Sequence, residues 1–230
     1  DVFSNYLKAQ EASPAAIVPA DLQNDQVVIF DFSSQNPALD QFDLTDVGAM
    51  NRYVFGSIEK AGAKLGAGGY LEERAVYQKS AVFDTMEGAS RSIHLGIDLW
   101  MPAGTPIFCP LAARVHSFQD NANFGDYGPT IILEHPGEIT FYSLYGHLSR
   151  ESLLDLAEGQ VLKAGEKFAA FGSEAVNGNW TPHLHFQLIL DMQGKKGDYI
   201  GVAPKSELDF YKKNCPDPNL ILGIPGLESV

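Results

Sequence analysis

The stretch NWTPHLHFQL, residues 179–188, places two histidines one residue apart in an apolar run typical of a β-strand. Alternate side chains of a strand point to the same face, so His183 and His185 are expected to face the same way. Two imidazoles on a half-buried face are costly unless something binds them. The pattern therefore suggests a metal site, for which the remaining ligands must lie elsewhere in the chain.

A second stretch, HLGID at residues 94–98, provides candidate ligands. On a strand, His94, Gly96 and Asp98 share one face, and since Gly96 has no side chain, the imidazole and the carboxylate can converge over it on one ion. With His185 from a neighbouring strand, the set becomes two imidazoles and one carboxylate. Three protein ligands and an open position are typical of catalytic zinc, whereas structural zinc usually has four ligands that include cysteine.

The remaining histidines are His116, His135 and His147. The first two are interpreted as structural histidines beside strands. His147, in YSLYGHLS, would by itself be a surface histidine at a strand end. Beside a metal site that already has a spare histidine, His183, it becomes a candidate catalytic residue.

The composition is that of an acidic globular protein. The chain has 230 residues, is 45% hydrophobic and has a net charge of −13, which fits one domain, or one domain with a sizeable flank. An acidic chain is expected to repel nucleic acid and anionic membrane surfaces. No apolar run approaches the roughly 18 residues of a membrane span. Cys109 and Cys215 are compatible with one long-range disulfide or with two free thiols, and no pattern indicates an oligomeric state.

Residues 1–75 are expected to form an α/β flank. DVFSNYLKAQ predicts a short helix at the start, and QVVIFDFSS (26–34) predicts a strand by its β-branched and aromatic content. A second helix is predicted from about Asp46 to Lys64, where apolar residues recur at helical spacing. We expect the flank to pack against the β core and to narrow the approach to the metal. The polar residues that would then reach the site are Asn51, Glu72 and Arg74.

Residues 76–204 have the pattern of a β domain. Short apolar runs such as PTIILEH and ITFYSLYGHL alternate with Gly, Pro and Asp turns, which favours an antiparallel β-sandwich or open barrel. One short helix is expected within it, in RESLLDLAEG (150–159). Residues 205–230 contain several prolines and are expected to form an irregular tail. The predicted fold class is mainly β, with an N-terminal α/β flank.

Four stretches, HLGIDLWMPAGTPIFCPLAARV, FYSLYGHLS, GQVLKAGEKFAAFG and TPHLHFQL, occur in the order found in lysostaphin/LytM-type zinc metallopeptidases, peptidase family M23. The resemblance covers about residues 91–190. It implies a small antiparallel β domain, hydrolysis of peptide bonds and one zinc ion per chain. In that family the HxxxD residues and the second histidine of HxH bind zinc, while two other histidines are catalytic. The corresponding metal ligands here are His94, Asp98 and His185, and the corresponding catalytic residues are His147 and His183.

Two departures bear on the substrate. The chain has GNWTPHLHF where the family usually has STGPHLHF, and AARV where xGxV is common. GGYLEERAVY, SIHLGIDLW and NCPDPNLIL also resemble a peptidase-like module fused to class III aminotransferases. The substrate is then either a peptide of peptidoglycan, which would indicate the cell envelope or periplasm, or a small peptide or amide, which would indicate the cytoplasm.

The mechanism implied by this site is hydrolysis by a metal-activated water. Zinc lowers the pKa of a bound water to about 7. His183 would take a proton from that water, and His147 would donate a hydrogen bond to the developing oxyanion. Two alternatives use the same fold or ligands: a non-haem iron oxygenase and a non-catalytic binding or regulatory module. A lipoyl- or biotinyl-carrier domain is disfavoured, because no lysine lies in a suitable hairpin.

Overall fold

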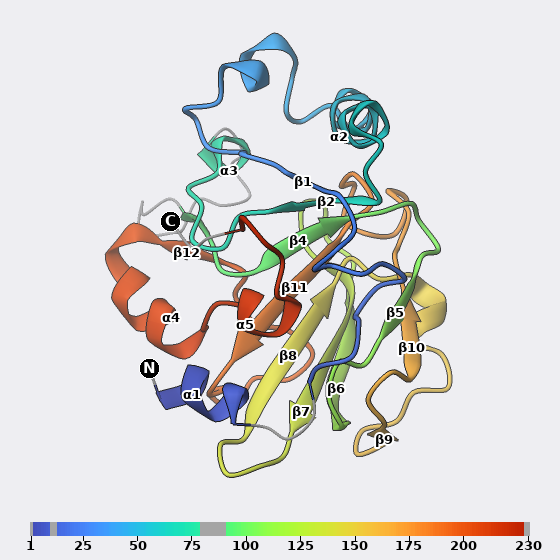
Figure 1. The fold of residues 1–230 in the computed structure, drawn as a ribbon, viewed down its shortest axis with the longest axis vertical. Coiled ribbons are helices and arrows are strands. Elements are labelled where there is room, and N and C mark those ends of the chain that lie inside the picture. The colour runs from blue at the N-terminus through green and yellow to red at the C-terminus, as the bar shows by residue number, and fades with distance from the viewer. Residues whose placement is uncertain (1, 10–12, 79–90, 228–230) are drawn as a thin grey trace.

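The computed structural model describes residues 2–9, 13–78 and 91–227. Its centre is an eight-stranded sheet in the order β1-β2-β4-β11-β8-β7-β6-β9, with two further two-stranded sheets, β10-β5 and β12-β3 (Figure 1). Only β1 and β2 pair in parallel within the large sheet, and its other pairs are antiparallel. The predicted fold class, mainly β with an antiparallel sandwich or open-barrel core, is confirmed, and the described strands form no closed barrel.

The strands follow one another closely after residue 90. They are β1 Val27–Ile29, β2 Leu65–Gly68, β3 Arg91–His94, β4 Ile97–Trp100, β5 Pro106–Phe108, β6 Ala113–Asn121, β7 Gly128–His135, β8 Phe141–Gly146, β9 Val161–Leu162, β10 Lys167–Ala170, β11 Leu184–Ile189 and β12 Val202–Pro204. The helices are α1 Val2–Lys8, α2 Val47–Ala61, α3 Ala75–Gln78, α4 Leu208–Asn214 and α5 Asn219–Leu222, with short 3-10 turns at Pro37–Gln41, Arg150–Leu153 and Lys205–Glu207.

Strand β11 lies in the interior of the large sheet, and every one of its residues is buried. It pairs on one side with β4, which places His185 opposite Asp98. On its other side it pairs with β8, which places His185 opposite Gly146. The residue after Gly146 is His147, so the register of three neighbouring strands brings these groups together. A slip of one residue would turn His185 to the other face.

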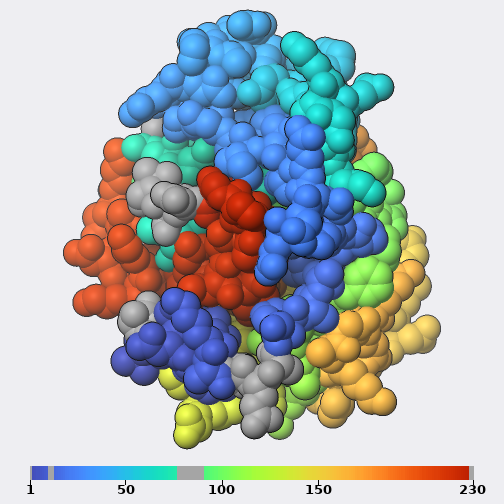
Figure 2. Space-filling view, in the orientation of Figure 1, coloured from blue at the N-terminus to red at the C-terminus, as the bar shows by residue number. Residues whose placement is uncertain are grey.

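The flank continues the large sheet. Its strands β1 and β2 form one edge, with β2 paired to β4. Helix α2 begins after Asp46, whose carboxylate accepts hydrogen bonds from two backbone amides, and ends at Gly62 in the left-handed conformation. The predicted helix is therefore confirmed, ending three residues earlier than expected. Figure 2 shows the flank, in blue, packed on the rest of the molecule.

A second apolar core joins the flank to the sheet. Phe30 and Phe32, from the flank, pack against Trp100 of β4 with ring centroids 5.4 and 5.2 Å apart. Gly66 makes this packing possible, since a Cβ at that position would lie 2.3 Å from a ring carbon of Phe30. The sheet and its second core therefore run across the predicted boundary at residue 75.

Two expectations about helices are wrong. The chain after residue 205, expected to be irregular, contains α4 and α5, whose buried side chains join the main core. These helices are too short to show a helical period in the sequence, and prolines separate them. The helix expected at 150–159 is only a 3-10 turn, Arg150–Leu153.

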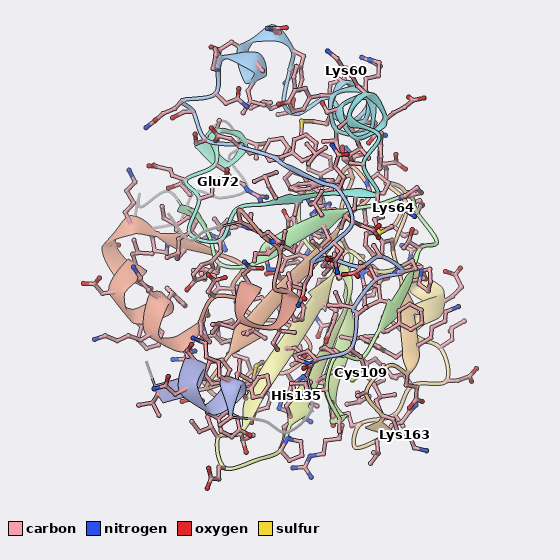
Figure 3. All side chains as sticks on the ribbon, in the orientation of Figure 1. Lys60, Lys64, Glu72, Cys109, His135 and Lys163 are labelled. Atoms are coloured by element: carbon pink, nitrogen blue, oxygen red, sulfur yellow. The ribbon has the colours of Figure 1, made fainter. Side chains whose placement is uncertain are left out.

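Both cysteines are buried free thiols, which settles the alternatives that the sequence leaves open. His135 is a core histidine, stacked on Phe141 and 2.7 Å from the Ser143 hydroxyl. In Figure 3, the labelled Cys109 and His135 lie toward the opposite end of the molecule from the labelled Glu72.

The packing of the flank gives a first prediction. Gly66→Ala should lower the free energy of unfolding by about 1–3 kcal/mol, because the new methyl group overlaps the Phe30 ring. Gly56→Ala is the matched control: Gly56 lies in α2 with open space around it, and the helix should gain roughly 0.5–1 kcal/mol. Urea unfolding followed by Trp fluorescence measures both. Equal stability of the two variants would contradict the packing described.

Candidate active site

The structure brings together all five residues that the sequence selects. Each is at least nine-tenths buried. His94 ends β3, Asp98 lies in β4, and His185 lies in β11. His147 directly follows β8, and His183 directly precedes β11.

The role expected of Gly96 is wrong in one respect. His94 and Asp98 are not on one strand, because β3 ends at His94 and β4 begins at Ile97. The chain bends between them, and β3 pairs with β12 rather than joining the large sheet. Gly96 is needed for a different reason: a Cβ there would lie 2.6–2.7 Å from Cε1 and Nε2 of His185. The glycine makes room for the incoming imidazole.

Three atoms form a compact triangle at the centre of the site. Nε2 of His94 lies 2.9 Å from Nδ1 of His185, and these two nitrogens lie 3.3 and 3.2 Å from Oδ1 of Asp98. Ligands held tetrahedrally at about 2.0–2.1 Å from zinc are roughly 3.3 Å apart. Among the His, Cys, Asp and Glu side chains of the described residues, these three form a group that could hold a metal ion.

The carboxylate of Asp98 has an unsatisfied oxygen. Asp98 is 1% exposed, and no described residue donates a hydrogen bond to its Oδ1. A buried carboxylate oxygen without a partner is costly, and such atoms in native structures usually indicate an ion or a water. The oxygen lies beside the two ring nitrogens, so a cation between the three atoms would satisfy it. The residues present therefore fit a metal ion.

The hydrogen bonds of the two ligand histidines fix the tautomer of each ring. Nδ1 of His94 lies 2.9 Å from the Gly69 carbonyl, so it carries the proton and Nε2 keeps its lone pair. Nε2 of His185 lies 2.9 Å from Oε1 of Gln187, and the Gln187 amide nitrogen donates to the Ile200 carbonyl. This orientation makes Oε1 the acceptor, so His185 is protonated on Nε2 and directs the Nδ1 lone pair to the centre.

His147 and His183 are held in the same manner. Nδ1 of His147 donates to the Asn177 carbonyl at 2.8 Å, and Nδ1 of His183 donates to the Thr181 carbonyl at 2.6 Å. Their ring centroids are 4.2 Å apart, and Nε2 of His183 lies 3.7 Å from Oδ2 of Asp98. In the neutral form, each ring has a lone pair on Nε2, and that of His183 lies beside the carboxylate of Asp98.

The backbone at His147 adopts a left-handed φ of 60°, which is unfavourable for a residue other than glycine. Hydrogen bonds on both sides hold it there: its amide donates to the Tyr127 carbonyl, and its own carbonyl accepts from Gly172. Strain that persists in this way concentrates at functional sites.

Burial favours the neutral forms of His94, His147 and His183. Burial, reinforced by the charge of Arg74, lowers the pKa of His94 to about 4. Burial also lowers the pKa of His183, and it holds the pKa of His147 well below the usual value. Burial opposes ionisation of Asp98, but its neighbours His94, Arg74 and His183 hold its pKa well below the usual range. Neutral imidazoles and an ionised carboxylate are the forms that bind metals.

Of the three flank residues expected near the site, Arg74 contacts Asp98, and Glu72 contacts Arg74 and the backbone of His94. Arg74 donates from Nη1 to Oδ2 of Asp98 at 2.5 Å and from Nε to Glu72 at 2.9 Å. Asn51 of α2 lies elsewhere: its amide donates to Glu174, in the loop before β11.

Two residues that the sequence analysis missed support the histidines. Gln187 follows His185 by two positions on the same strand face, and a polar residue in such a buried run was the available signal. The ring of Tyr127 lies 5.0 Å from that of His185, and Gly146 and Gly201 make room for it. No spacing rule connects Tyr127 to the site, because a loop distant in sequence places it there.

A cavity of about 420 Å³ opens on the site. Its size is that of a pocket for a small molecule or a few residues of a peptide. One wall comes from the flank and includes Leu44, Val47 and Met50. The other comes from the loops before β7 and before β11 and includes Phe124 and Trp180. The flank thus lines the approach to the five residues.

The open antiparallel sheet and its buried His–Asp–His group fit a metallopeptidase. The sequence model of peptidase family M23 matches residues 92–201, nearly half of the chain. The five residues of the site all lie within this matched segment. None of the described helices is long and apolar enough to cross a membrane.

Solved structures with similarity to the chain include a zinc containing peptidase from Vibrio cholerae, at 27% identity and a TM-score of 0.36, covering 44% of this chain and 28% of that one. Another is the catalytic domain of the antimicrobial peptidase lysostaphin from Staphylococcus simulans, at 24% identity and a TM-score of 0.38, covering 53% of this chain and 80% of that one. The chain spans less than a third of the Vibrio cholerae protein. No curated protein matches it.

The hydrogen bonds around the ligand histidines give a second prediction. In the metal-free protein at neutral pH, His94 should be protonated on Nδ1 and His185 on Nε2. Long-range ¹H–¹⁵N NMR correlations distinguish the two tautomers. Gln187→Leu removes the acceptor and should leave His185 as a tautomer mixture while His94 is unchanged. The opposite tautomers in the unsubstituted protein would contradict the ligand atoms assigned above.

Proposed function

We propose that the chain is a zinc metalloendopeptidase with one zinc ion, held by Nε2 of His94, Oδ1 of Asp98 and Nδ1 of His185. The observation that supports this most is the unpartnered Oδ1, 3.2–3.3 Å from two ring nitrogens that both direct lone pairs toward it. Nitrogen and carboxylate ligands, three in number, favour catalytic zinc. When bound, zinc would polarise the scissile carbonyl and make a bound water acidic.

His183 is assigned as the general base. Its Nε2 has a lone pair beside the ligand group, and its Nδ1–H donates to the Thr181 carbonyl, which orients the ring and stabilises the protonated form. The ring also lies against Trp100, with centroids 5.8 Å apart and planes 27° apart. Nδ1 is therefore occupied, and Nε2 is the ring nitrogen that faces the site.

His147 requires a refinement of the predicted role. Because its Nδ1–H already donates to Asn177, the neutral ring has no proton on Nε2 to donate to an oxyanion. It becomes a donor only when protonated. With the two rings 4.2 Å apart, we infer that His147 and His183 hold one proton between them during turnover. The protonated ring stabilises the oxyanion and protonates the leaving amine.

The two alternative functions make less use of these groups. An iron oxygenase would need the three ligands but gives no role to the two basic Nε2 atoms. A non-catalytic module would need neither the three ligands nor the two Nε2 lone pairs. Metal analysis of protein purified without added metal separates zinc from iron.

The proposed substrate is a peptide, either in peptidoglycan cross-links or as a small peptide or amide. The first would place the protein in the cell envelope, the second in the cytoplasm. The test is incubation of the zinc-loaded protein with purified peptidoglycan and with synthetic peptides, followed by mass analysis. New amine termini support the proposal. Unchanged substrates in every reaction would refute it.

Three substitutions separate ligand from base. His185→Ala removes a ligand, so zinc content should fall far below one per chain. His183→Ala should keep zinc and lose activity by about 10²–10⁴-fold, the usual contribution of a general base. His147→Ala should keep zinc and lose about 10²–10³-fold. Zinc content and turnover are measured on the same preparations.

The control for these variants is His116→Ala. His116 is a partly exposed histidine of β6 outside the site. It should leave both zinc content and turnover unchanged. Loss of zinc from His183→Ala together with its retention by His185→Ala would reverse the assigned roles.

A further inference from the structure

We propose that Arg74 is a positioning residue of the metal centre: it occupies Oδ2 of Asp98 and thereby leaves Oδ1 as the single carboxylate oxygen that binds the metal. The inference rests on the proposed function, because it concerns the same centre. Arg74 lies in the flank, so the flank contributes a residue that orients a ligand of the metal centre.

The two oxygens of Asp98 have separate surroundings. Oδ2 accepts from Nη1 of Arg74 at 2.5 Å. Oδ1 has no donor among the described residues and lies 3.3 Å from Nε2 of His94 and 3.2 Å from Nδ1 of His185. The carboxylate is thus oriented with one oxygen toward a permanent cation and the other toward two lone pairs. This is the arrangement of a ligand that binds through one oxygen.

Arg74 is itself fixed independently of any metal. Its Nε donates to Glu72 at 2.9 Å, and the other oxygen of Glu72 accepts from the Phe32 amide at 2.8 Å. The guanidinium lies over the rings of Phe32 and Trp100, 5.7 and 5.9 Å from their centroids. A planar group with donors at fixed angles suits this position, whereas a lysine would supply the charge alone.

The backbone places Arg74 in register with a ligand. Leu71 donates to the His94 carbonyl, the His94 amide donates to Glu72, and the Arg74 amide donates to Ser92. The segment that holds Arg74 therefore pairs with β3, the strand that ends in His94. One short stretch of backbone sets both the arginine and the ligand.

Occupation of Oδ2 has two chemical consequences. It prevents the carboxylate from binding the metal through both oxygens, so one coordination position stays open for water or substrate. It also keeps Oδ2, 3.7 Å from Nε2 of His183, from turning toward that base. With a neutral residue at position 74, Oδ2 could turn toward the metal ion or toward His183.

Cobalt(II) substitution tests the proposal, because four-coordinate cobalt absorbs visible light more strongly than five-coordinate cobalt. The full chain should give the strong spectrum of three protein ligands and one water. Arg74→Gln should give a weaker, five-coordinate spectrum and raise the zinc Kd about 10- to 100-fold, the usual cost of removing an outer partner of a ligand. Arg74→Lys and Glu72→Gln should shift both quantities in the same direction by less. Competition with a chromophoric chelator gives the zinc Kd.

Arg91→Gln is the matched control. Arg91 lines the same cavity, so this variant removes an equal charge without removing a contact to Asp98. It should keep the spectrum and the affinity of the unsubstituted chain. Circular dichroism shows whether each variant is folded, and if Arg74→Gln is not, Arg74→Lys and Glu72→Gln give the result.

The outcomes are distinct. If the unsubstituted chain binds no cobalt at this site, the proposed function fails. If it binds cobalt but the folded variants at positions 74 and 72 keep its spectrum and zinc Kd, the role of Arg74 is overturned. Equal shifts in the Arg91→Gln control would also overturn it, since a general charge effect would then explain the result.

Discussion

The structure depends on an ionised carboxylate kept in the interior. Asp98 is 1% exposed, and a charge taken out of water must be compensated by partners at close range. Arg74 compensates one oxygen, and two imidazoles stand beside the other. Without Arg74 the site would contain an unpaired buried charge, and the lone pairs beside Oδ1 leave that oxygen for a metal ion. The architecture around Asp98 can be understood as the set of constraints that keeps them in place.

Those constraints come from both parts of the chain. The sheet supplies His185 through the register of β11 with β4, and Gly96 leaves space for its ring. The flank supplies Arg74, held by Glu72, and packs its aromatic side chains against Trp100. The flank is therefore part of the site as well as of its approach. An M23 domain cut at residue 92, where the family match begins, would lack the partner of its own aspartate.

The sequence was sufficient for the fold class. It also selected five residues that lie together in the structure, and for His183 and His185 this follows from strand alternation, which is local geometry. It was insufficient where geometry is not local. The bend at Gly96 arises because β3 leaves the large sheet to pair with β12. The hydrogen bond between Arg74 and Asp98 joins the segment between β2 and α3 to β4, and the polarity of Arg74 only suggested that it could reach the site. Helices α4 and α5 could not be predicted, because elements of seven and four residues have too few turns to show a helical period in the sequence.

The central claim is that His94, Asp98 and His185 together bind one metal ion. Anomalous diffraction at the zinc edge, from crystals of protein never exposed to chelator, tests it most directly. The account predicts one strong peak, about 2.0–2.2 Å from Nε2 of His94, Nδ1 of His185 and Oδ1 of Asp98, with Oδ2 still on Arg74. A peak bound by other residues, or no peak between these three atoms, would contradict it.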